Sequence, residues 1–134
     1  MKTQNDILTA LYLAAKASPI DGLNGGIYKR IRPTDSELED CVINTIGGVN
    51  GQFLQDGAIL IKIFYNDVKE NNTYFENTLR GGELEAMLLE FSNVLLKNNG
   101  FLSFDIRSRQ TYTEKFLEMN QHYAILRMNF KIAN

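Results

Sequence analysis

The sequence predicts a single α+β domain in which two helices pack on one face of a mostly antiparallel sheet. The chain has 134 residues, which is an ordinary size for one domain. Its composition, 44% hydrophobic and 22% charged, is typical of a chain that folds around a core rather than of a disordered chain. Helical and alternating apolar patterns follow one another in the order helix, strands, helix, strands.

The first helix is expected over residues 5–17. Its end is indicated by Ser18-Pro19, because the residue before a proline is pushed out of the α region. Lys16 falls in the last turn, where a cation suits the helix dipole. The apolar residues that recur at helical spacing are Ile7, Leu8, Leu11, Ala14 and Ala15.

Three strands are expected next, over residues 27–32, 41–47 and 52–65. The first stops at Pro33, which suits an edge strand or a strand end because proline lacks a donor for the ladder. The second is rich in β-branched residues, which favour strands. Asn50-Gly51 lies between the second and third strands and favours a hairpin turn.

The third strand is apolar on nearly both faces. One face carries Ile59, Ile61, Ile63 and Tyr65, and the other carries Ala58, Leu60 and Phe64. This pattern is typical of a central strand that is covered on both sides. Another subunit, rather than this chain, could cover one of the two sides.

A polar segment, residues 66–82, precedes the second helix, which is expected over residues 83–98. Connectors of this length are usually functional or mobile. The helix carries one apolar stripe. Three strands close the chain, over residues 101–107, 111–117 and 122–132, and the last of them alternates cleanly between apolar and polar residues.

Charge and composition exclude several classes of protein. The formal net charge of −2 argues against attraction of the whole chain to nucleic acid or to an anionic membrane. No apolar run approaches the roughly 20 residues of a membrane helix, so we expect a soluble, cytoplasmic protein. Cys41 is the sole cysteine and His122 the sole histidine, which rules out an intrachain disulfide and any site that needs two imidazoles.

No catalytic motif is evident, so we expect no enzymatic activity, no cofactor and no metal. Cys41 begins an apolar strand and is expected in the core. His122 is expected at the surface, and a nucleophilic pair with Cys41 has no local signature. The glycine-rich segment 47–51 fits a hairpin tip better than a phosphate loop, because it lacks the lysine and Ser/Thr of a P-loop.

Charged residues gather in two acidic and two basic groups. The acidic groups, expected to be solvated turns rather than metal ligands, are Asp35, Glu37, Glu39 and Asp40, and then Asp67, Glu70 and Glu76. The basic groups are Lys29, Arg30 and Arg32 beside Tyr28, and then Arg107 and Arg109. A small nucleic-acid-binding module that uses Lys29, Arg30 and Arg32 is one interpretation. Ion pairing to acidic segments, within the chain or across an interface, is at least as well favoured by the balanced charge.

The order of elements resembles that of the tail-terminator or tail-completion proteins of long-tailed phages and prophages. A Tyr-x-x-x-Arg-Pro patch, Tyr28 to Pro33, accompanies this order. The segment 66–82 is longer than in that family. The resembling stretches are the helix 6–17, the strand from Ile27-Tyr28 to Arg32-Pro33, the strands 39–43 and 57–65, the helix 83–96, and the closing strands 104–105 and 123–132.

The resemblance implies a structural protein that forms a hexameric ring, caps the tail tube and joins head to tail. Its partners would be its own copies, the tail tube and the head connector, with DNA only passing through the lumen and no membrane involved. It would act in the host cytoplasm during assembly and then in the virion tail. The hairpin 47–57 and the segment 66–82 would meet the tail tube or the connector. The residues expected at interfaces are Tyr28, Arg30, Arg32, Val49, Asn50, Phe53, Ile61, Ile63, Tyr65, Tyr74, Phe75, Arg107 and Arg109.

Overall fold

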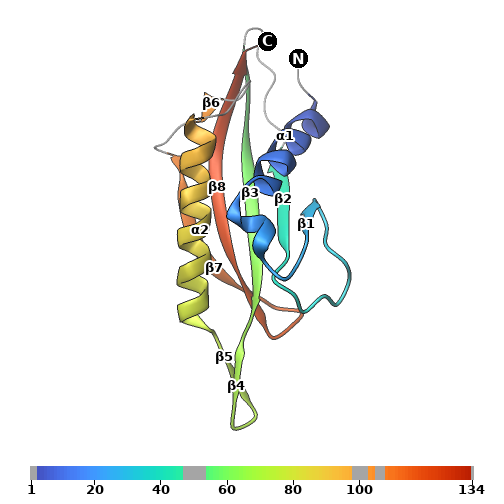
Figure 1. Cartoon of the computed structure of the whole chain (residues 1–134), viewed down its shortest axis with the longest axis vertical. Coiled ribbons are helices and arrows are strands. Elements are labelled where there is room, and N and C mark those ends of the chain that lie inside the picture. The colour runs from blue at the N-terminus through green and yellow to red at the C-terminus, as the bar shows by residue number, and fades with distance from the viewer. Residues whose placement is uncertain (1–2, 47–53, 98–102, 105–107, 134) are drawn as a thin grey trace.

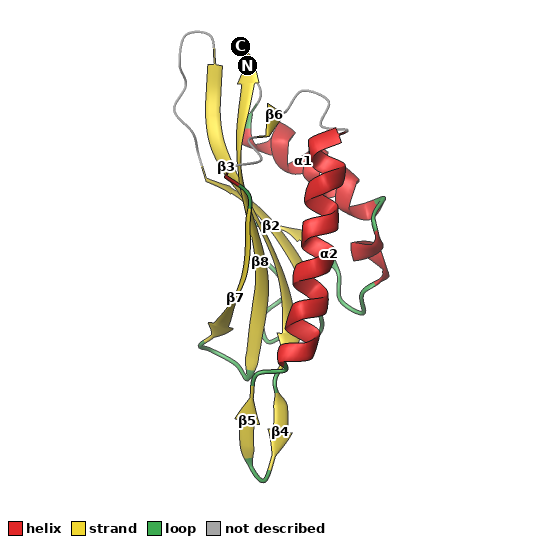
Figure 2. Ribbon diagram, turned by 90° about the vertical axis from the view of Figure 1, so that its left-hand side faces the viewer, coloured by secondary structure: helices red, strands yellow, loops and turns green. Residues whose placement is uncertain are grey.

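A computed structural model describes residues 3–46, 54–97, 103–104 and 108–133 of the chain. Two helices, α1 (Gln4–Lys16) and α2 (Thr78–Lys97), lie on one face of a six-stranded sheet (Figure 1, Figure 2). The predicted α+β class is therefore confirmed. The strands of the sheet are β1 (Ile27–Lys29), β2 (Cys41–Ile46), β3 (Leu54–Asn66), β6 (Ser103–Phe104), β7 (Gln110–Phe116) and β8 (Gln121–Ala133). A short helix, η1 (Pro19–Gly22), follows α1, and a separate pair, β4 (Val68–Glu70) and β5 (Thr73–Phe75), follows β3.

The sheet has the strand order β1-β2-β3-β8-β6, and β7 also pairs with β8. β1 and β2 run parallel, and every other described pair is antiparallel. β3 and β8 are thirteen residues each and pair along their whole length, from Leu54 opposite Ala133 to Asn66 opposite Gln121. This long central pair is the frame on which the rest of the domain is built.

The start of α1 is set by Thr3 and Asp6. The Thr3 side chain accepts a hydrogen bond from the Asp6 backbone N–H, while the Asp6 carboxylate accepts one from the Thr3 backbone N–H, which forms a capping box. The helix ends one residue before Ala17, close to the predicted end. Its buried face consists of Ile7, Leu8, Leu11 and Ala15.

α2 begins at Thr78, five residues before the start predicted from the sequence. Asn77 caps it, because its side-chain oxygen accepts a hydrogen bond of 3.1 Å from the backbone N–H of Arg80. Gly81 and Gly82, at the end of the predicted connector 66–82, lie inside the helix. A Cβ atom at Gly81 would stand 2.5 Å from the Tyr65 hydroxyl, so the glycine lets the helix approach β3 closely.

The strand boundaries differ from the predicted ones at a few positions. β1 ends at Lys29 rather than at residue 32, since Arg30 has a φ of 69°, which is incompatible with a continuing strand. Of the predicted strand 101–107, the described part is a strand at Ser103–Phe104. The predicted hairpin tip, residues 47–51, lies outside the described residues.

The hydrophobic core lies between the helices and the inner face of the sheet. Ile59, Ile61, Ile63 and Tyr65 have no exposed surface and pack beneath α1 and α2. On the outer face, which carries Ala58, Leu60 and Phe64, no helix covers the described part of the sheet (Figure 2). The two faces of β3 therefore have different surroundings, and only the inner one is covered by helices.

Candidate assembly surfaces

β4 and β5 form a hairpin that projects beyond the end of the sheet (Figure 1, Figure 2). We call residues 68–75 the arm. Asn71 and Asn72 connect the two strands and have φ values of 50° and 65°, as a type I′ hairpin turn requires. Only Asp67 separates β3 from β4, so the arm continues the course of the central strand. The predicted connector 66–82 is thus not a loop: it is this hairpin followed by the first turns of α2.

All six strand residues of the arm are exposed. Val68, Tyr74 and Phe75 retain 46%, 44% and 53% of their accessible surface, which is unusual for large apolar side chains. The register pairs Val68 with Phe75 and Glu70 with Thr73, and strand alternation puts these four on one face, with Lys69 and Tyr74 on the other. An isolated two-stranded hairpin is marginally stable in water. A partner surface that covers the face with Val68 and Phe75 would therefore stabilise the arm.

A cluster of charged side chains fixes the root of the arm. The Asp67 side chain is 1% exposed, and its two oxygens lie 2.5 Å from His122 Nδ1 and 2.8 Å from Lys115 Nζ. The other imidazole nitrogen, Nε2, lies 3.2 Å from Glu76 Oε1. Because Asp67 precedes the arm and Glu76 follows it, His122 connects both ends of the arm to β8. We call these four residues the clamp.

The clamp corrects two predictions. His122 is largely buried rather than at the surface, with a side chain 13% exposed, and Asp67 is not in a solvated turn. Both imidazole nitrogens face carboxylates on opposite sides of the ring, so the carboxylates do not converge on one point. Among the described residues, no group of three or more His, Cys, Asp or Glu side chains is arranged to hold a metal ion.

Arg32 and Asp40 form a buried ion pair on the outer side of the sheet. Arg32 Nε lies 3.2 Å from Asp40 Oδ2, and the two side chains are 10% and 1% exposed. The guanidinium lies 4.0 Å from the centre of the Phe64 ring, in cation–π geometry. Burial lowers the pKa of Arg32, and the Asp40 carboxylate opposes that effect. The prediction that Asp40 belongs to a solvated turn is wrong. Arg32 forms its ion pair with a carboxylate of its own chain.

A hollow of about 240 Å³ lies beside this ion pair on the outer face of the sheet. Its lining includes the cationic side chains of Arg30 and Lys62 together with apolar groups of Ile31, Leu60, Phe64 and Phe116, and we call this site the hollow. Ile31 is 78% exposed at its rim. Neither Arg30 nor Lys62 forms an ion pair with a described carboxylate, although Lys62 Nζ lies 4.7 Å from the Tyr123 ring centre.

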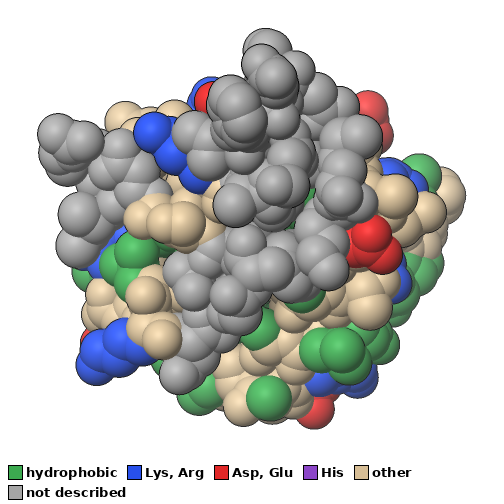
Figure 3. All heavy atoms as spheres, turned by 90° about the horizontal axis from the view of Figure 1, so that it is seen from above, with side chains coloured by type: hydrophobic (Ala, Val, Ile, Leu, Met, Phe, Trp, Pro, Cys, Tyr) green, Lys and Arg blue, Asp and Glu red, His purple; other side chains and the backbone are tan. Residues whose placement is uncertain are grey.

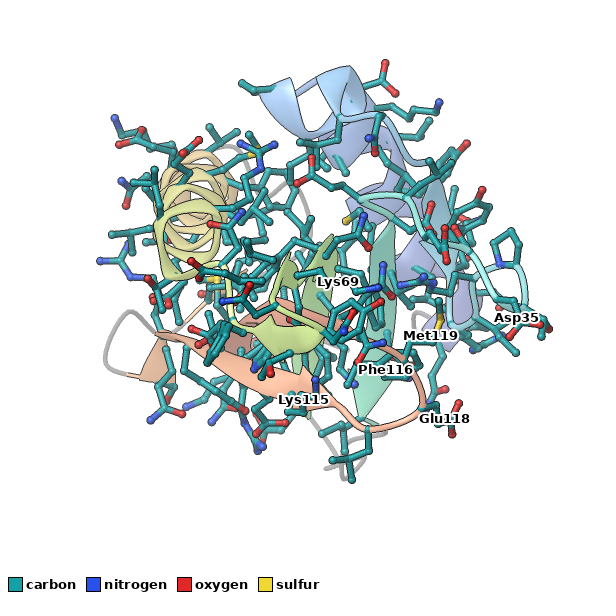
Figure 4. The ribbon with its side chains drawn as sticks, turned by 90° about the horizontal axis from the view of Figure 1, so that it is seen from below. Asp35, Lys69, Lys115, Phe116, Glu118 and Met119 are labelled. Atoms are coloured by element: carbon teal, nitrogen blue, oxygen red, sulfur yellow. The ribbon has the colours of Figure 1, made fainter. Side chains whose placement is uncertain are left out.

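Tyr123, beside Lys62, is held by its neighbours on the outer face. Its hydroxyl donates a hydrogen bond of 2.6 Å to Glu114 Oε2. Burial and this carboxylate raise the pKa of Tyr123 to about 12. A second, separate pocket of about 210 Å³ lies where the loop that carries Asp35 faces Phe116 and the Glu118-Met119 turn (Figure 4).

The remaining predicted interface residues have varied locations. Arg109 donates to Ser92 Oγ (3.1 Å) and Asn93 Oδ1 (2.6 Å), so it ties the start of β7 to α2. Ile61, Ile63 and Tyr65 lie in the core and are not available to a neighbour, which corrects their assignment. Tyr28 is half-buried, and Arg30, Tyr74 and Phe75 are exposed. Val49, Asn50, Phe53 and Arg107 lie outside the described residues.

Cys41 occupies the core, as predicted. It is 1% exposed, and burial raises the pKa of its thiol to about 12. It lies opposite Ile63 in the sheet, whereas His122 lies opposite Tyr65 and contacts the clamp carboxylates. The nucleophilic pair considered from the sequence is therefore not formed.

The sequence alone does not mark Val68, Ile31 or Lys62 as surface contacts, and it predicts a solvated turn, not an interface, for Glu70. The sequence does contain a pattern that indicates a hairpin at the arm. Asn71-Asn72, a pair that favours a turn, separates two short runs that contain the strand-favouring residues Val68 and Thr73-Tyr74-Phe75. Ile31 and Lys62 carry no such signal, because the hollow is made by residues that are distant in sequence.

Comparison with known proteins adds no further assignment. No protein-family model matches the chain, and no curated protein matches it significantly. None of the helices in the described part of the chain is long and apolar enough to cross a membrane. At the end opposite the arm, both acidic and basic side chains of the described residues are visible (Figure 3).

Proposed function

We propose that this chain is a structural subunit that assembles with its own copies into a ring, as a tail terminator that caps a phage tail tube. The observation that carries the proposal is the arm. It leaves the body of the domain, all its strand residues are exposed, and three of them are large apolar side chains. Exposed apolar surface on a protruding element is typical of a subunit contact.

An arm of this kind favours a head-to-tail contact. The surface that it meets on a neighbour is different from the arm itself, so the contact is heterologous and repeats from copy to copy. Such contacts close into a ring when the rotation between copies allows it, and otherwise give a filament. The resemblance to tail terminators, which depends on the order helix, strands, helix, strands, favours the ring.

The role that follows is capping of the tail tube and docking of the head connector, without catalysis. DNA would pass through the lumen, and a near-neutral subunit is compatible with passage because it makes few phosphate contacts. The alternative, a nucleic-acid module built on Lys29, Arg30 and Arg32, is weakened by two contacts. Arg32 is paired with Asp40, and Lys29 donates a hydrogen bond of 2.9 Å to Thr9.

The test is the mass of the particle in solution. We expect mass photometry and light scattering across a range of concentrations to show closed particles of about six subunits, and electron microscopy to show rings. The matched control replaces residues 68–75 by Asn-Gly, which can join Asp67 to Glu76 as a two-residue hairpin turn. This variant should melt close to the wild-type temperature and remain monomeric. A wild-type chain that stays monomeric at every concentration would contradict the proposal.

A further inference from the structure

We infer that the arm of one copy enters the hollow of the next copy, with Val68 and Phe75 against its apolar groups and Glu70 beside Arg30 and Lys62. This inference rests on the proposed function, since it names the contact that joins neighbouring subunits. The partner is a second copy of this chain, and the contact is head-to-tail because arm and hollow share no residue.

The arm cannot occupy the hollow of its own chain. The hollow borders Leu60, Lys62 and Phe64 on the outer face of β3, and the arm begins beyond the end of that strand. With a rise of about 3.3 Å per residue, Val68 lies roughly 20 Å along the strand from Lys62. The clamp holds the arm in line with β3 and directs it away from the body (Figure 2).

The two surfaces match in polarity. The arm face that carries Val68 and Phe75 presents two exposed apolar side chains. The hollow offers apolar groups of Leu60, Phe64 and Phe116, beside the Arg32 guanidinium that lies over the Phe64 ring. Its volume of about 240 Å³ is sufficient for a phenyl ring, because a cavity of about 150 Å³ already holds benzene.

The two surfaces also match in charge. Glu70 lies on the same arm face as Val68 and Phe75 and forms no ion pair with a described residue. Arg30 and Lys62, at the hollow, are likewise without a carboxylate partner in the described chain. In the inferred contact, one unpaired carboxylate faces two unpaired cationic side chains. Complementary charge of this kind sets the register of an interface.

The apolar groove on α2 fits the arm less well. It has a volume of about 480 Å³ and runs between Pro19 and the face of α2 that carries Met87 and Phe91. Glu83 and Glu90 border it, so it would repel Glu70. The hollow is the site of opposite charge, and it is the site we assign to the arm.

Charge reversal tests the contact directly. Glu70→Lys and Arg30→Glu should each raise the dissociation constant of the assembly by about tenfold or more, because each puts like charges together. An equimolar mixture of the two variants should recover assembly. In the mixture, the reversed arm of the Glu70→Lys variant meets the reversed hollow of the Arg30→Glu variant, and the unchanged arm of the second meets the unchanged hollow of the first. The recovered particle should contain the two variants in equal numbers, as native mass spectrometry would show.

Lys69→Glu is the matched control, because Lys69 lies on the opposite face of the arm and its reversal should leave assembly unchanged. If the wild-type chain assembles and both reversals also assemble normally, the contact is wrong while the proposed ring stands. If the wild-type chain never assembles, both fail. If Arg30→Glu abolishes binding of a fluorescent DNA duplex without changing the particle mass, the hollow is a nucleic-acid site and the inference is overturned.

Discussion

At the residue scale, the adjacent glycines of α2 have opposite surroundings. A Cβ atom at Gly81 would meet the Tyr65 hydroxyl at 2.5 Å, whereas a Cβ atom at Gly82 would have nothing within 4 Å. Gly82→Ala should raise the free energy of unfolding by about 0.5–1 kcal/mol, since alanine is the better helix former. Gly81→Ala should lower it by about 1–3 kcal/mol through overpacking against a buried side chain.

Urea denaturation of the two variants measures this difference. Each variant serves as the other's control, because the substitution is the same and the positions are neighbours in one helix. Equal effects at the two positions would show that the approach of α2 to Tyr65 does not limit the packing.

The Cys41 thiol should not react with thiol-specific reagents in the native protein. Its thiol is 1% exposed and has a pKa raised to about 12, so the reactive thiolate is scarce at neutral pH and cannot meet a reagent. We expect a maleimide to label the urea-unfolded chain fully and the native chain hardly at all over the same period. Rapid labelling of the native chain at pH 7 would mean that β2 opens from the sheet.

Residue types predicted which apolar side chains are buried better than they predicted which charged side chains are buried. The apolar periodicity of α1 and the placement of Cys41 follow from local sequence. The burial of Asp40 does not, because it depends on Arg32 and on a hydrogen bond from the backbone N–H of Gly26, fourteen residues away. Pairing between separate segments is a tertiary property. Because of this pairing, Asp40 is buried although the local sequence predicts a solvated side chain.

At the scale of elements, the arm depends on the clamp for its direction. His122→Ala removes the side chain that lies between Asp67 and Glu76. Backbone amides of the arm should then exchange with deuterium faster, while those of β3 and β8 keep most of their protection. Hydrogen exchange followed by mass spectrometry resolves the two regions.

Asp21→Ala is a suitable control for this experiment. Asp21 pairs with Lys16 at the exposed end of α1, so its loss removes a surface ion pair that is remote from the arm in the sequence. Unchanged exchange in the arm of the His122→Ala variant would show that the hairpin is held by its own strands.

The sequence predicted which elements exist more reliably than where they begin. The predicted start of the second helix is five residues late, because Gly81 and Gly82 are poor helix formers and lie in its first turns. The sequence predicts a connector in place of the arm, because the strands of the arm have three residues each and are too short for a periodic pattern to appear. Both errors arise where a contact with Tyr65 or with the clamp determines the local structure.

At the scale of the whole molecule, assembly and folding should respond differently to salt. The inferred contact pairs Glu70 with Arg30 and Lys62 at a surface, where ions screen it. The Arg32–Asp40 pair is buried and is screened much less. Raising the salt from about 0.05 M to about 0.5 M should therefore dissociate particles at a fixed low concentration, with little change in melting temperature.

Analytical ultracentrifugation and a thermal melt, performed on the same samples, measure both quantities. If salt strengthens the particle instead, apolar contact dominates the interface, and the roles of Val68 and Phe75 outweigh that of Glu70.

The α+β class was predictable at this scale, because it depends only on the order of periodic segments. The hollow was not, since four separate parts of the chain contribute to it.

The clamp also bears on how fast subunits meet. Three charged side chains and one imidazole already fix the direction of the arm in the free chain, so a collision does not have to order it first. Preorganisation of this kind reduces the entropy lost on association. Growth of the ring should accordingly proceed at the rate of docking between preformed surfaces, about 10⁵–10⁷ M⁻¹s⁻¹, with no slow folding step before each addition.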